Sequence, residues 1–274
     1  MLIADYANEQ PPGSRLGPLS DMMVEEDLAA PIDMYRAAIF RILNYGTAAR
    51  LRGDPFLGRL LVLGVVSAAE AYFRAILSSC IEMCPLAQSG AAHKAINLGG
   101  LLWHGKEGFS RSAFEHASFT SRKELNAAFL DFLSMPLDDK VFKSLLEEYE
   151  IVCQLRHGIV HGDGLLPGKN AVQLDIPRYG RPVRITVNYA HLQDIASVVT
   201  TLVATVNRET FSKMCERWAI QWRKRADWDV SKETARFNAI WAVFHSTEEL
   251  KTRRGRSQVT RARCLAAVKL ANGL

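Results

Sequence analysis

The sequence lacks both a segment typical of a membrane span and an N-terminus typical of a secreted protein. A bilayer-spanning helix needs about 20 consecutive apolar residues, and the most apolar stretch, "LLVLGVVSAAEAYF" from Leu60, is interrupted by Glu70. The N-terminus has no basic region followed by an apolar run. We therefore expect a cytoplasmic protein without a membrane partner.

Cysteines are too few and too widely spaced for a disulfide framework. The chain has five of them, an odd number. Cys80 and Cys84 would fall one turn apart on a helix, which is the spacing of a zinc-binding pair. No second Cys/His pair has ligand spacing, so the pattern favours buried thiols in a reducing compartment.

Acidic residues are absent from one end of the chain and concentrated at the other. The first 30 residues carry six acids and a single base, whereas residues 251–274 carry seven bases and no acid. This asymmetry fits a polyanionic partner such as nucleic acid, and it equally fits a solvated tail. The candidate nucleic-acid contacts in the tail are Arg253, Arg254, Arg256, Arg261 and Arg263.

Proline, glycine and apolar spacing divide the chain, which shows no internal repeat. Residues 1–30 predict an irregular acidic leader, because the prolines and glycines of "PPGSRLGP" break helices. A helix over about 56–84 is apolar nearly all round, as expected of the central helix of a bundle. Ser121 and Glu124 have the spacing of a helix-capping box. Further helices are expected over 31–52, 91–103, 121–135, 137–161, 189–225, 231–251 and 256–271.

One segment departs from the helical pattern. "AVQLDI" and "RPVRITV" alternate in polarity around "PRYG", which predicts a β-hairpin at about 171–188. The predicted fold class is therefore all-α. A helical bundle over 31–210 carries this small hairpin insert, and a basic helical C-terminal extension follows over 211–274.

The stretch "CQLRHGIVHGDG", residues 153–164, combines an arginine and two histidines at an expected helix end. Arg156 and His161 are five residues apart, which leaves their side chains about 140° apart on a helix. They face one cleft only if the helix ends between them or if a second copy supplies the other side. His157 and His161 are four residues apart and share a face.

Three interpretations of this stretch remain open on spacing alone. In phosphodiester cleavage, histidine moves protons and arginine neutralises phosphate, while the RNA's own 2′-hydroxyl attacks, so no metal is needed. In a metal site, His157, His161 and Asp163 would supply ligands. In a structural interpretation, Arg156 caps helix carbonyls and both histidines are hydrogen-bonded core residues.

"LRHGIVHGDG" resembles the arginine–x4–6–histidine motif of the HEPN superfamily (higher eukaryote and prokaryote nucleotide-binding domain), with Arg156 and His161 at the motif positions. The residue after the motif arginine is most often asparagine in that family, whereas here it is His157. "VVSAAEAYFRAIL" resembles the family's early long helix, with Glu70 and Arg74 at its polar positions. The resemblance covers roughly residues 31–210.

The resemblance implies a metal-independent endoribonuclease without a cofactor, which commonly works as a homodimer. The arginines and histidines of both chains would then face one another across the dimer cleft. Members of the family act as toxins with antitoxin partners, in phage defence and in RNA processing. Other members only bind nucleotides or partner proteins, so a non-catalytic binding module is the alternative.

Two further groups of residues have more than one interpretation. Glu70 and Arg74 are four residues apart and suit either a structural ion pair or a supporting role in the cleft. His157 is a second supporting candidate. Trp218 and Trp222 lie among several bases, which is the composition of a surface that stacks on RNA, but their spacing favours packing in a core.

Overall fold

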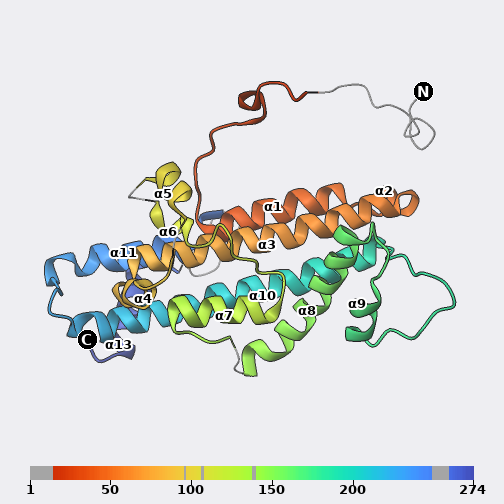
Figure 1. Cartoon of the computed structure of the whole chain (residues 1–274). Helices are drawn as coiled ribbons and strands as arrows, with labels where there is room; N and C mark the ends of the chain where they lie inside the picture. The colour runs from red at the N-terminus through yellow and green to blue at the C-terminus, as the bar shows by residue number, and fades with distance from the viewer. Residues whose placement is uncertain (1–14, 96, 106–107, 138–139, 249–258) are drawn as a thin grey trace.

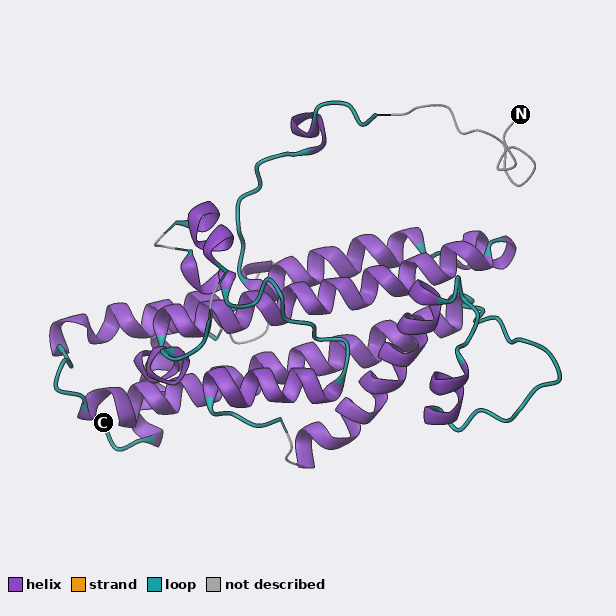
Figure 2. Cartoon of the chain, viewed as in Figure 1, coloured by secondary structure: helices purple, strands orange, loops and turns teal. Residues whose placement is uncertain are grey.

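The protein is all-α, and its long helices surround one central helix (Figures 1 and 2). The central helix, α3 (Pro55–Met83), packs against α1 (Pro31–Tyr45), α8 (Lys140–His161) and α10 (Tyr189–Glu216). The predicted helical fold class is thereby confirmed. The computed structural model describes residues 15–95, 97–105, 108–137, 140–248 and 259–274.

Local sequence signals set the ends of α3. The carboxylate of Asp54 accepts a hydrogen bond from the Leu57 amide (3.0 Å), and Pro55 occupies the first helical position. Cys84 ends the helix, and Pro85 begins α4 (Pro85–Ala91). The prediction of a helix over 56–84 is thus correct to within one residue at each end.

Burial around α3 follows from its composition. Fully buried side chains such as Val62, Phe73 and Ile76 contact neighbours on several sides. By length and composition α3 also qualifies as a membrane-spanning candidate, and half of its most apolar window is buried inside the protein. The core helix of a soluble bundle meets the same length and composition test.

Ser121 is the N-cap of α7 (Arg122–Leu133), and its side chain accepts the first of the two hydrogen bonds of the predicted capping box. The Ser121 hydroxyl accepts a hydrogen bond from the Glu124 amide at 3.1 Å and donates one to the Glu124 carboxylate at 3.0 Å. The helix ends at Ser134, whose φ of 47° is left-handed. The shorter helices before α7 in the chain include α2 (Ala48–Gly53), α5 (Leu98–His104) and α6 (Phe109–Ser112).

The predicted β-hairpin at 171–188 does not form. Its first half begins inside a helix, α9 (Gly168–Gln173), and continues as a loop. Its second half forms a single antiparallel bridge, between Arg184 and Leu165, and the Ile185 amide donates to the Gly164 carbonyl at 2.7 Å. The two halves do not pair, because the second one bonds to the turn after α8.

The chain beyond residue 210 continues the bundle without a break. The boundary expected there lies inside α10, which is followed by a π-helical turn (Arg217–Gln221). Trp218 and Trp222 are buried in the core, as their spacing favours, and are not exposed for stacking on RNA. The next helix, α11 (Glu233–Phe244), packs on α1, α3 and α10.

The last helix, α13 (Arg261–Ala271), lies at the end of the bundle opposite α9 (Figure 1). Cys264, Leu265 and Val268 pack against the core, and the Lys269 ammonium lies 2.6 Å from the Glu233 carboxylate. Of the candidate tail contacts, Arg261 and Arg263 are exposed on this helix. The other three, Arg253, Arg254 and Arg256, lie outside the described residues.

Candidate functional site

Arg156, His157 and His161 lie on the last two turns of α8. The helix runs on through His161, so it does not end between the motif arginine and the motif histidine. Arg156 is half-buried, whereas both histidines are exposed. The rings of His157 and His161 contact each other, with centroids 4.5 Å apart. A second copy is therefore the remaining way to bring Arg156 and His161 into one cleft.

The glycines after the motif allow the chain to turn back against the end of α8. The Gly158 carbonyl accepts hydrogen bonds from the amides of Gly162 (3.0 Å) and Gly164 (3.2 Å). A Cβ on Gly162 would clash with the Leu165 carbonyl oxygen. Gly164 has a φ of 82°, and a Cβ there would lie 2.8 Å from the Arg59 side chain. The turn thus depends on these glycines.

Asp163, within this turn, contacts Arg184. Its carboxylate forms an ion pair with Arg184 (3.3 Å), and its carbonyl accepts a second hydrogen bond from the same guanidinium. The part of the chain that the structure describes contains no group of three or more His, Cys, Asp or Glu side chains placed to hold a metal ion. The metal-site interpretation of the stretch gains no support from this arrangement.

A cavity of about 140 Å³ opens beside the motif, between α8 and α9. Arg156 and His157 form part of its wall, and Lys169 of α9 faces the same space. Among the described residues, no carboxylate lines the cavity, which makes it a polar, basic pocket. Its other lining residues are Thr120, Cys153, Gln154, Asn170 and Gln173.

Buried amides hold α9 in place over α8. Asn170 is 3% exposed, and its amide donates to the side-chain oxygen of Gln154. The Gln154 amide in turn donates to the Glu150 carboxylate at 2.6 Å, which also accepts from the backbone amide of Arg122 at 2.9 Å. This chain of hydrogen bonds joins α7, α8 and α9, so the segments that form the pocket wall are held in fixed positions relative to one another.

The cationic side chains of this pocket are unpartnered. Within the described residues, the side chains of Arg156, His157 and Lys169 form no hydrogen bond or ion pair. Desolvation lowers the pKa of His157, and the positive charges of His161, Arg156 and Lys169 lower it further. Burial raises the pKa of the Cys153 thiol to about 12, so this thiol stays protonated and unreactive.

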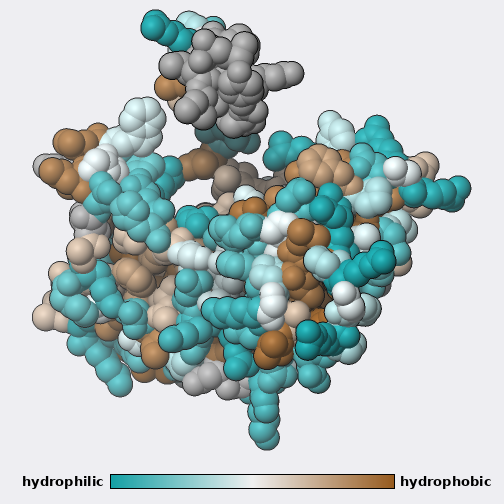
Figure 3. Space-filling view, turned by 45° about the vertical axis from the view of Figure 1, so that its right-hand side comes forward, coloured by the Kyte–Doolittle hydropathy of each residue, from teal (hydrophilic) through white to brown (hydrophobic). Residues whose placement is uncertain are grey.

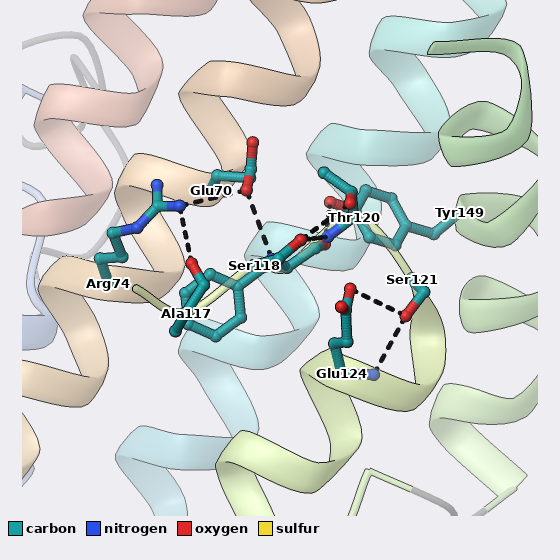
Figure 4. Close-up of polar contacts among 9 residues, drawn as sticks. Glu70, Arg74, Ala117, Ser118, Thr120, Ser121, Glu124 and Tyr149 are labelled. Atoms are coloured by element: carbon teal, nitrogen blue, oxygen red, sulfur yellow. Dashed lines mark hydrogen bonds and ion pairs between the residues drawn. The ribbon is translucent and has the colours of Figure 1, made fainter. Parts of the chain in front are cut away.

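Glu70 and Arg74 contact a neighbouring loop rather than Arg156 or the histidines (Figure 4). Their side chains pair at 3.2 Å, Glu70 accepts from the Phe119 amide at 3.3 Å, and Arg74 donates to the Ala117 carbonyl at 2.9 Å. The Tyr149 hydroxyl donates to the Phe119 carbonyl at 2.9 Å. This loop carries Thr120 to the pocket wall, so the ion pair supports the site indirectly.

The predicted site residues are thus only partly brought together. Arg156 and His157 share the pocket, and His161 contacts His157 without lining the pocket. The basic α13 lies at the other end of the bundle (Figure 1). Lys169 and Asn170 were outside the sequence prediction, because "GKN" has no spacing that marks a binding site.

Figure 3 brings the α9 end of the molecule forward and shows a face on which hydrophilic and hydrophobic side chains are mixed.

No protein-family model, curated protein or solved structure matches the chain.

Proposed function

We propose that the protein is a metal-independent endoribonuclease of the HEPN type. One observation carries the proposal: an arginine and two histidines lie on the last two turns of α8, beside a pocket that no carboxylate of the described residues lines. Arginine and histidine suit RNA cleavage without a metal, because arginine neutralises phosphate and histidine transfers protons near neutral pH. The resemblance of the same residues to the HEPN motif points to the same chemistry.

In the proposed reaction, Arg156 binds the scissile phosphate and neutralises the charge that develops on it. The 2′-oxygen attacks phosphorus while its proton passes to a base, and the 5′-oxygen leaves with a proton from an acid. His161 performs one of these two proton transfers. The products are a 2′,3′-cyclic phosphate and a 5′-hydroxyl.

The proposed active form is a two-fold homodimer. Arg156 and His161 point about 140° apart on one continuous helix. Two copies of residues 153–164 near a two-fold axis would place the arginine of one chain opposite the histidine of the other. By its resemblance, the protein would act in the cytoplasm as a toxin or phage-defence effector, under the control of an antitoxin or another regulatory protein.

A non-catalytic module that binds a nucleotide or nucleic acid is the second candidate. It is favoured by the fact that the pocket contains Arg156 and His157 but excludes His161. A pocket of this kind can bind an anion through Arg156 without the motif histidine, His161, taking part.

RNA cleavage in the presence of a chelator separates the two candidates. The purified full-length protein is incubated with mixed RNA and excess EDTA, and the new ends are analysed for cyclic phosphate. The proposal predicts cleavage that His161→Ala abolishes. Binding of RNA without cleavage by the wild-type protein, with or without divalent ions, would leave the binding module as the function.

A further inference from the structure

We propose that the pocket between α8 and α9 is a phosphate-binding site, in which Lys169 acts with Arg156 to hold one phosphate group of the substrate. The RNA identity of that substrate rests on the proposed function. The binding of phosphate itself does not, and it can be measured separately.

The wall of this pocket consists largely of hydrogen-bond donors. The guanidinium of Arg156 and the ammonium of Lys169 come from different helices, and neither has a partner within the described residues. The side chain of Gln173 is likewise unpaired there, and His157 adds a ring nitrogen. Charge-assisted hydrogen bonds from arginine and lysine are the usual means by which proteins bind phosphate.

The framework of the pocket is fixed without using these donors. Asn170 is buried and bonds to Gln154, which bonds to Glu150. The carboxylate of Glu150 therefore engages the Gln154 amide and the Arg122 backbone, and it does not line the pocket. The two cations consequently remain available for a ligand.

The size of the pocket limits the ligand to a small group. A volume of about 140 Å³ is well below the roughly 300–1,000 Å³ of pockets that enclose drug-sized ligands. It fits a phosphate group of a longer molecule, with the sugars and bases remaining outside. This is the geometry needed to bind RNA by its backbone, without reading its sequence.

Three other cavities in the described part of the chain offer less suitable chemistry. A pocket of about 240 Å³ is lined by Arg122, Lys123 and Lys143, but Leu137 and Leu146 form part of its wall. Two larger cavities near α1 and α3 include carboxylates, among them Asp33, Glu248, Glu82 and Glu115. Carboxylates repel a phosphate, so these two cavities are poor candidates.

The test is a titration of the full-length protein with inorganic phosphate, using calorimetry and the NMR signals of the His157 ring. Lys169→Gln removes the ammonium group that is proposed to bind the phosphate. Lys143→Gln is the matched control: it removes an exposed lysine of the other cationic pocket, 13 residues from Arg156 on the same helix and thus about 20 Å away. Lys169→Arg keeps the positive charge at this position. Phosphate binding restored by this variant would show that the loss in Lys169→Gln comes from the missing charge and not from altered folding.

The proposal predicts that Lys169→Gln weakens phosphate binding about tenfold or more, as expected when a charge-assisted hydrogen bond is removed. Lys143→Gln should change it less than about twofold, and Lys169→Arg should restore most of it. In the wild type, bound phosphate should raise the pKa of His157, because it places negative charge beside the ring. Equal losses in both lysine variants, or no phosphate binding by the wild type, would overturn the proposal.

RNA cleavage by the same variants distinguishes failure of the phosphate-site proposal from failure of the proposed nuclease function. Cleavage that depends on His161 and is unaffected by Lys169→Gln would refute the phosphate site and leave the nuclease intact. Phosphate binding that depends on Lys169, in a protein that cleaves no RNA, would support the site and refute the nuclease.

Discussion

The rings of His157 and His161 lie with centroids 4.5 Å apart and planes tilted by 47°, on the last turn of the helix that carries the motif. Two imidazoles this close disfavour a state in which both are charged. His157 is also beside Arg156 and Lys169, and desolvation together with the positive charges of His161, Arg156 and Lys169 lowers the pKa of His157. The charge of His161 therefore acts on the pKa of His157, and only His161 has a motif counterpart.

We predict that His157 titrates below the ordinary histidine value of about 6.5. His161→Gln and Lys169→Gln should each raise its pKa, because each removes a positive charge that disfavours the protonated ring. The measurement is an NMR pH titration of the histidine side chains in the full-length protein. A pKa at or above the ordinary value, unchanged in both variants, would refute the coupling.

We predict that Glu70→Gln destabilises the fold and leaves the chemistry nearly unchanged. The Glu70 side chain is 13% exposed and holds both Arg74 and the backbone of the loop before α7. Weakening these interactions should lower the free energy of unfolding by about 1–3 kcal/mol and the melting temperature by several degrees. Thermal melts and RNA cleavage per folded molecule are the readouts. Normal stability with abolished cleavage would instead place Glu70 among the residues that act on the substrate.

We predict that the tail arginines contribute salt-dependent RNA affinity. Replacing Arg253, Arg254, Arg256, Arg261 and Arg263 by glutamine should flatten the plot of log affinity against log salt, by about 0.7 for each RNA phosphate that is no longer neutralised. Substitution is preferable to deletion of 251–274, because Leu265 and Val268 of α13 are partly buried against the core. The same slope in both proteins would show that the tail does not bind RNA.

We predict that the active site draws on two chains. Light scattering should show a dimer, and an equal mixture of Arg156→Ala and His161→Ala chains should regain cleavage that neither variant has alone. Random pairing makes half of the dimers mixed, and each mixed dimer has one intact site, so about a quarter of wild-type activity is expected. No recovery after subunit exchange, or an active monomer, would contradict the composite site.

The helices were predictable wherever strong local signals marked them. Pro55, Pro85 and the capping residue Ser121 define helix ends through their own backbone chemistry, without help from distant residues. The apolar character of α3 likewise identified the centre of the bundle, because a helix that is apolar nearly all round must be buried.

Tertiary contacts determine the structure of the segment 171–188 and the position of Lys169, which the local sequence pattern did not predict. "AVQLDI" has the alternation of a strand, yet its first residues complete α9, which is held by the buried side chain of Asn170. The second run bonds to Gly164 and Leu166 after α8, and that pairing depends on how closely the glycine turn approaches the helix. Lys169 joins the candidate site for the same reason, since only the docking of α9 brings it beside Arg156.

Cleavage and stability measured on the same variants test the central claim most directly. Arg156→Ala and His161→Ala should each lower the RNA cleavage rate about 10²-fold or more. The melting temperature should change little, because His161 is exposed and Arg156 has no hydrogen bond or ion pair within the described residues. Arg156→Lys should fail as well, since lysine lacks the planar fork, and the double variant should be scarcely worse than either single one. Destabilised variants that cleave RNA normally per folded molecule would contradict the assignment of Arg156 and His161 as catalytic residues.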